Sequence, residues 1–127
     1  MNYLSIAIGG AVGALLRYVV SGLAYSYFGE TFPWGTLVVN VIGSFLIGFL
    51  WQLFDQLVIS ANTRIFLLTG VLGAFTTFST FSLETFNLLR DGEVRLGIIN
   101  VVVSTAAGLI TVFLGFVAAR FLLEIGK

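Results

Sequence analysis

Apolar residues in this chain form four long stretches that short polar segments separate. Each stretch has at least the ~20 residues that an α-helix needs to cross a bilayer core of about 30 Å. Helices satisfy their own backbone hydrogen bonds, so helices are favoured over strands in lipid. The pattern predicts an all-α membrane protein with one four-helix transmembrane domain over residues 1–127. The expected spans are about 3–28, 35–54, 65–89 and 96–123.

The third stretch interrupts the apolar pattern in its middle. Five of the seven residues from Thr76 to Ser82 are Ser or Thr, and Gly70 and Gly73 precede them. Side-chain hydroxyls can bond to their own helix backbone and bend the helix. We therefore expect the third helix to be broken at mid-membrane depth. Non-helical backbone at that depth is tolerated only where it is buried in protein or lines a cavity.

Three phenylalanines lie in the same polar segment. Phe75, Phe78 and Phe81 recur every three residues and so share roughly one helix face. Such a face usually serves only for packing. Aromatic rings also have positive edges, and beside hydroxyl and amide donors those edges would suit a small anion. Unwound carbonyls at a break could in turn hold a cation. The residues alone leave these interpretations open.

Three polar side chains lie at costly depths in the predicted spans: Arg17, Asn40 and Glu84. A charge at the bilayer centre costs at least about 2.5–3.5 kcal/mol unless it reaches the interface or is paired. Arg17 either anchors the first helix or attracts anions into a water-filled vestibule. Asn40 either links two helices or donates to a ligand. Glu84 either pairs with Arg17 or another arginine, or lines a pathway.

Composition narrows the function classes further. Hydrophobic residues make up 58% of the chain and charged residues 9%, against about 25% charged residues in soluble domains. Most of the surface must therefore face membrane lipid. The chain has no cysteine and no histidine, which removes thiol chemistry, disulfides, imidazole bases and the usual zinc ligands. Only Glu84 remains as a membrane-buried base, so we expect no enzyme. A net charge of zero without a basic run argues against nucleic acid as a partner.

The distribution of positive charge gives almost no orientation signal. Four spans would place Arg64, Arg120 and Lys127 on one side of the membrane and Arg90 and Arg95 on the other. An excess of Lys and Arg normally fixes the cytoplasmic side. One interpretation is that a weak bias, which this count misses, still fixes one orientation. The interpretation we favour is insertion in both orientations, so that two opposite copies pair as a dual-topology antiparallel homodimer. The two-fold axis of such a dimer lies in the membrane plane.

Two stripes of small residues indicate close helix contacts, because small side chains let helix backbones approach in lipid. Each stripe suits packing within one chain or a seam between two copies, and the spacing does not separate these alternatives. The stripes are Gly9 and Gly13 in the first span, and Ser104, Gly108, Thr111 and Gly115 in the fourth.

Three segments together carry a specific family resemblance. Residues 9–18 (GGAVGALLRY), 35–45 (GTLVVNVIGSF) and 70–84 (GVLGAFTTFSTFSLE) resemble the signatures of the first three spans of the Fluc family of bacterial fluoride channels. The similarity extends over the whole chain. It implies an antiparallel homodimer in the bacterial inner membrane, with two pores that conduct fluoride passively and selectively.

The resemblance also implies roles for individual residues. Asn40 would donate a hydrogen bond to fluoride, and Arg17 would provide charge near a vestibule. The expected fluoride pathway comprises Asn40, Phe78, Phe81, Ser79, Thr80, Ser104 and Glu84. The backbone carbonyls of Gly73 and Thr76 from both subunits would enclose one structural sodium ion (Na+). Two positions depart from the family pattern: Ala74 replaces a second glycine, and Asn100 stands where many members carry tyrosine.

Two other function classes remain as alternatives. Small proton-coupled multidrug exporters are also four-helix, dual-topology dimers, but they rely on a carboxylate in the first span. The first span here carries Arg17 and no acidic residue. The other alternative is a membrane scaffold that transports nothing, against which the polar segment of the third span argues.

Overall fold

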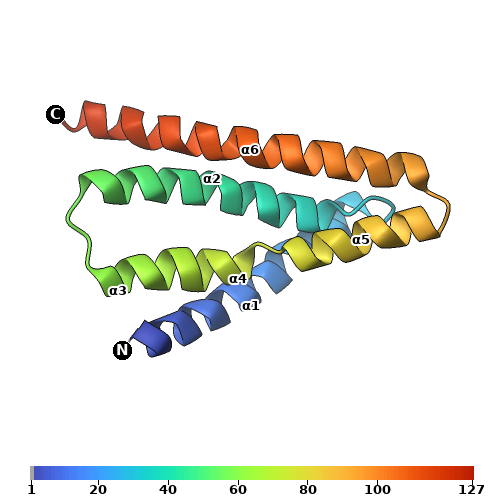
Figure 1. The fold of residues 1–127 in the computed structure, drawn as a ribbon, viewed down its shortest axis with the longest axis horizontal. Coiled ribbons are helices and arrows are strands. Elements are labelled where there is room, and N and C mark those ends of the chain that lie inside the picture. Colours follow the sequence, from blue (N-terminus) through green and yellow to red (C-terminus); the bar gives the residue numbers. More distant parts are fainter. Residues whose placement is uncertain (1) are drawn as a thin grey trace.

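The computed structural model describes residues 2–127, and within that range it contains helices and turns but no strand (Figure 1). The elements are α1 (Asn2–Phe28), α2 (Trp34–Gln56), α3 (Ala61–Arg64), the π-helix η1 (Ile65–Leu72), α4 (Gly73–Phe75), α5 (Phe78–Arg90) and α6 (Val94–Ile125). Four helical spans in these residues are long and apolar enough to cross a membrane: 2–28, 34–56, 61–90 and 94–125. The prediction of an all-α, multi-pass membrane protein is confirmed.

The long helices α2 and α6 lie side by side, and glycines permit their close approach (Figure 1). A Cβ atom added to Gly48 would overlap the carbonyl of Val112, and one added to Gly115 would overlap the carbonyl of Phe45. The small-residue stripe of the fourth span thus packs against α2 of the same chain.

Helix α1 crosses the bundle obliquely and packs on η1 and α4 (Figure 1). Gly9 and Gly13 are buried there, and an added Cβ would overlap the carbonyls of Phe66 and Val71 respectively. A Cβ on the adjacent Gly10 would meet no atom within 4 Å. The first small-residue stripe therefore also packs within the chain.

Large apolar side chains cover the outside of the bundle. Leu15, Leu109 and Phe113 are between 63% and 70% exposed, and in the most apolar 18-residue window of each span at most 22% of the residues are buried. This surface suits lipid, because the apolar groups have no water to avoid inside a bilayer.

The third span is broken at its centre, as the sequence predicts. Helix α4 ends at Phe75 and α5 begins at Phe78, while Thr76 and Thr77 are extended, with ψ angles of 157° and 113°. Before the break the helix is wider than an α-helix, since η1 has π-type hydrogen bonding over eight residues. Wide turns of this kind often mark functional sites, and no pattern in the apolar run 65–72 indicated this one.

Candidate functional site

Asn40 on α2 holds the broken backbone in place. Its side-chain Oδ1 accepts a hydrogen bond from the backbone N–H of Thr77 at 2.8 Å, and its Nδ2 donates to the Thr77 carbonyl at 3.1 Å. The Oδ1 atom therefore replaces the helical acceptor that the Thr77 N–H lost, and Nδ2 adds a second donor to the Thr77 carbonyl, which as N-cap also accepts the first hydrogen bond of α5. One of the two N–H groups of Nδ2 remains for a further acceptor.

The break leaves backbone carbonyls without their helical partners. The amide that would normally bond the Gly73 carbonyl is that of Thr77, which bonds to Asn40 instead. The amide that would normally bond the Thr76 carbonyl is that of Thr80, which bonds to the Thr77 hydroxyl at 3.1 Å. Across residues 2–127, neither carbonyl accepts another hydrogen bond. These are the two carbonyls that the family resemblance assigns to sodium.

The other side of the break presents hydrogen-bond donors. The backbone N–H groups of Phe78 and Ser79 open α5 and meet no acceptor in the described part of the chain. The N-terminus of a helix carries partial positive charge from its aligned peptide dipoles. Thr77 caps this helix, and its hydroxyl also lies 3.0 Å from the Thr80 hydroxyl and 3.3 Å from that of Ser79.

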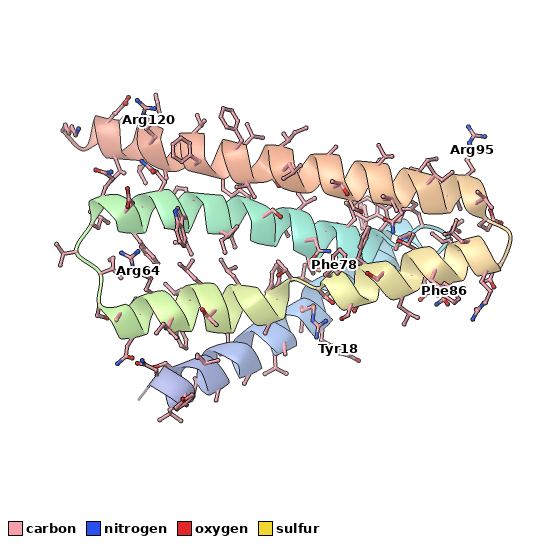
Figure 2. All side chains as sticks on the ribbon, in the orientation of Figure 1. Tyr18, Arg64, Phe78, Phe86, Arg95 and Arg120 are labelled. Carbon is pink, nitrogen blue, oxygen red and sulfur yellow. The ribbon has the colours of Figure 1, made fainter. Side chains whose placement is uncertain are left out.

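A cavity of about 290 Å³ opens beside the break. Its lining includes Asn40, Gly73, Thr76 and Phe78. Figure 2 shows Phe78 at the junction of α4 and α5, and the residue is 79% exposed. The Phe81 ring lies 5.6 Å from that of Phe78, at 43°. The two rings thus form a contiguous aromatic surface next to the donors.

A second cavity, of about 340 Å³, lies between α1, α2 and α5, shares Thr77 with the first, and contains both of the deep charges. Arg17 and Glu84 line it, together with Thr80. Of the two interpretations of Glu84, the ion pair with an arginine does not form, because within residues 2–127 Glu84 has no salt bridge. Its two carboxylate oxygens instead accept hydrogen bonds from the hydroxyls of Tyr25 and Thr36.

A chain of hydrogen bonds joins α5 to α6 and involves Ser104. The Ser104 hydroxyl donates to Asn100 Oδ1 at 3.0 Å, and Asn100 Nδ2 donates to the Thr85 hydroxyl at 2.9 Å. Thr85 in turn donates to the Phe81 carbonyl at 2.8 Å. Asn100 is only 2% exposed, so this link ties the backbone at Phe81 to α6.

A family model described as "CrcB-like protein, Camphor Resistance (CrcB)" matches residues 4–116 of the chain. The chain belongs to the CrcB family. Curated CrcB relatives carry the name fluoride-specific ion channel FluC, so the family predicted from the three motifs is confirmed.

Three of these relatives show how far the CrcB likeness extends. The protein of Opitutus terrae is 54% identical over 120 residues, which cover 92% of this chain and 91% of the relative. The protein of Salinibacter ruber is 50% identical, with 97% and 92% covered. That of Magnetococcus marinus is 47% identical, with 92% and 96% covered. The likeness therefore includes all four helical spans.

Sequence reasoning missed Tyr25, Thr36 and Thr85, which complete the polar contacts of this CrcB protein. Tyr25 stands near the end of the first span, where an aromatic residue is ordinarily an interface anchor. Thr36 and Thr85 are single hydroxyls in apolar helices. The sequence marks them only by their neighbours: Thr36 lies four residues before Asn40, and Thr85 directly follows Glu84.

Proposed function

We propose that this CrcB protein is a passive channel that exports fluoride from the bacterial cytoplasm across the inner membrane and excludes chloride. The observation that carries this proposal is the broken third span, which brings amide, hydroxyl and aromatic groups to mid-membrane depth. The names of the relatives, fluoride-specific ion channels, support the choice of ion. They also support transport over catalysis.

Fluoride is small and holds water tightly, so its passage needs donors that compensate for lost hydration. The proposed path is lined by Asn40, Phe78, Phe81, Ser79 and Thr80. The second N–H of Asn40 and the positive ring edges would face the ion. A chloride-sized anion fits the same narrow path poorly, although field strength contributes to selectivity as well as size. A negative-inside potential then expels fluoride with about 2.3 kcal/mol per 100 mV.

The ends of the proposed path are polar as well. Arg17 supplies positive charge near one vestibule and lines the second cavity without an ion pair in residues 2–127. Glu84 and Ser104 extend the path away from the break. The Ser104 hydroxyl must release Asn100 Oδ1 before it can donate to an anion, because it has a single proton.

The working unit in this proposal is an antiparallel homodimer with two pores. Gly73 and Phe78 are exposed in one copy of the chain although they lie at the centre of the span. Unpaired backbone groups at this depth require protein or a cavity around them, since lipid offers no hydrogen bonds. A second copy over the break would meet this requirement. The nearly balanced Lys and Arg count supports the opposite orientation of the two copies.

A sodium ion fits the carbonyls at the break. The Gly73 and Thr76 carbonyls lack helical partners, and carbonyls at the C-terminal end of a broken transmembrane helix are typical sodium ligands. In an antiparallel dimer both copies would contribute this pair. The bound ion would supply positive charge that compensates the carbonyl dipoles and holds the two copies together.

Anion efflux from liposomes tests the proposal. Purified dimers are reconstituted in liposomes loaded with fluoride or chloride, and potassium with valinomycin sets the potential. We expect rapid loss of fluoride and retention of chloride. Phe78→Ile and Phe81→Ile should slow fluoride efflux, because they remove the ring edges. Phe86→Ile is the matched control on the same helix, since Phe86 is 58% exposed and lies outside the proposed path.

Two results would contradict the proposal. Folded dimers that release no fluoride would refute the channel. Equal loss of fluoride and chloride would leave a pore but refute its selectivity.

A further inference from the structure

Glu84 lies between two cavities of different character. The inner cavity of about 340 Å³ reaches Arg17 and the break residues Thr77 and Thr80. The outer cavity, of about 170 Å³, lies toward the loops and is lined by Glu30 and Asp91, among others. Glu84 lines both cavities. An ion that travels between the break and this end of the bundle therefore passes its carboxylate.

The Tyr25 ring packs against Gly35 on α2, and this contact brings its hydroxyl to Glu84. A Cβ added to Gly35 would overlap the Tyr25 ring and crowd the Ser21 carbonyl, so only glycine lets the ring lie against α2. The ring then directs its hydroxyl to Glu84 on α5, and the hydroxyl also lies 3.4 Å from that of Thr36 on α2. Three helices thus meet at one carboxylate.

The hydroxyls of Tyr25 and Thr36 both donate to Glu84 and have no proton left for another acceptor. Each hydroxyl has one proton to donate, and both protons of this cluster go to Glu84. The carboxylate would repel a passing anion, while the Arg17 guanidinium draws anions into the same inner cavity. An anion in that cavity and the Glu84 carboxylate therefore compete for the same two hydroxyls.

We infer that Tyr25 is an anion-binding residue of this channel, whose hydroxyl donates to Glu84 at rest and to the passing anion once Glu84 turns away. The inference rests on the proposed function and adds a hydroxyl donor from α1, where Arg17 is the other path residue, to groups that otherwise come from α2, α5 and α6. In the outer cavity Asn87 and Thr31 offer replacement donors to the displaced carboxylate. Thr36 makes the same exchange as Tyr25.

Fluoride efflux from liposomes gives the first test. Tyr25→Phe keeps the ring on Gly35 and removes only the hydroxyl. We expect efflux to fall about ten-fold, because a hydrogen bond to a charged group is lost. Tyr27→Phe is the matched control: Tyr27 lies on the same helix, is 84% exposed, and its hydroxyl forms no hydrogen bond within residues 2–127. Efflux by Tyr25→Phe dimers within two-fold of the control would overturn the inference.

Fluorine NMR on protein labelled with 3-fluorotyrosine gives a second test that does not depend on flux. The Tyr25 resonance is assigned as the one missing from Tyr25→Phe, or, if that variant does not fold, by elimination with Tyr3→Phe, Tyr18→Phe and Tyr27→Phe, which identify the resonances of the other three tyrosines. We expect this resonance to shift on titration with fluoride and not with chloride. We also expect it to move in Glu84→Gln without any added anion.

The two tests separate the inference from the proposed function. Wild-type dimers that release no fluoride refute the channel, whatever the spectra show. Wild-type dimers that release fluoride while the Tyr25 resonance stays fixed refute the anion contact alone. A Tyr25 resonance that responds equally to chloride also refutes it, because the donor would then not belong to a fluoride-selective path.

Discussion

Replacing Asn40 with alanine should destabilise the protein by removing the support of the broken helix. The substitution deletes two hydrogen bonds, of 2.8 and 3.1 Å, which connect the Asn40 amide to both backbone groups of Thr77. The site is partly buried, so water replaces these partners poorly. An unsatisfied buried donor or acceptor costs ~1–3 kcal/mol, whereas polar contacts between membrane helices average ~0.6 kcal/mol in measured cycles. We therefore expect a loss of about 2–4 kcal/mol in the free energy of unfolding.

Equilibrium unfolding in mixed detergent micelles, followed by circular dichroism, measures this loss. Asn87→Ala is the matched control, because the Asn87 side chain forms no hydrogen bond in the described residues and its replacement should change stability by less than about 0.5 kcal/mol. Asn40→Asp refines the test, since the carboxylate still accepts from the Thr77 N–H but cannot donate to its carbonyl. If Asn40→Ala unfolds like the control, Asn40 does not hold the break and the reasoning fails.

Further predictions address packing, capping and ion binding. Gly13→Ala should destabilise the protein by about 2 kcal/mol or more in the same unfolding assay, because its Cβ overlaps the Val71 carbonyl, whereas Gly10→Ala should have little effect. Thr77→Val removes the N-cap of α5 and should cost about 1 kcal/mol. Arg64→Gln should lower stability as well, since its Nη2 donates to the Phe54 carbonyl at 2.8 Å near the end of α2. Replacing sodium by a large organic cation should dissociate the proposed dimer in size-exclusion chromatography, and unchanged elution would contradict the sodium site.

The four membrane spans and the break in the third could be predicted because each depends only on a short stretch of the sequence. Apolar length defines a membrane span regardless of what the span packs against, so the four helices could be predicted. The break could also be predicted, because the hydroxyl run from Thr76 to Ser82 and the glycines before it weaken the helix on their own. The sequence could not show that Asn40 supports the broken helix, because several groups in the chain could have accepted a hydrogen bond from its amide.

The contacts of Glu84 depend on distances that the sequence does not contain. Arg17, one of the possible partners, lies eight residues before Tyr25 on α1, about 12 Å along the helix axis. Tyr25 reaches the carboxylate instead because α1 crosses the bundle obliquely and Gly35 admits the ring (Figure 1). A crossing angle of this kind arises from the fit of Gly9 and Gly13 onto η1. Two hydroxyls therefore donate to the Glu84 carboxylate, for which the sequence offered an arginine as one possible partner.

Arg64 was one of the positive charges used to predict membrane orientation, but its side chain also stabilises the fold. Figure 2 shows Arg64 between the end of α2 and the start of the third span, while Arg120 and Arg95 project from opposite ends of α6. Arg64 bonds the Phe54 carbonyl, and its guanidinium lies 5.8 Å from the centre of the Phe54 ring. The charge count alone could not separate this anchored arginine from the exposed ones.

The chemical nature of the groups at the break has a consequence for acidic surroundings. The polar groups between α4 and α5 are amides, carbonyls and hydroxyls of Asn40, Gly73 and residues 76–80. None of these groups takes up or releases a proton near neutral pH. The hydrogen bonds that these groups can offer to an ion are therefore the same in acid as at neutrality. Acid is also the condition in which hydrogen fluoride crosses membranes and delivers fluoride to the cytoplasm, so the proposed channel keeps its binding groups intact when export is most needed.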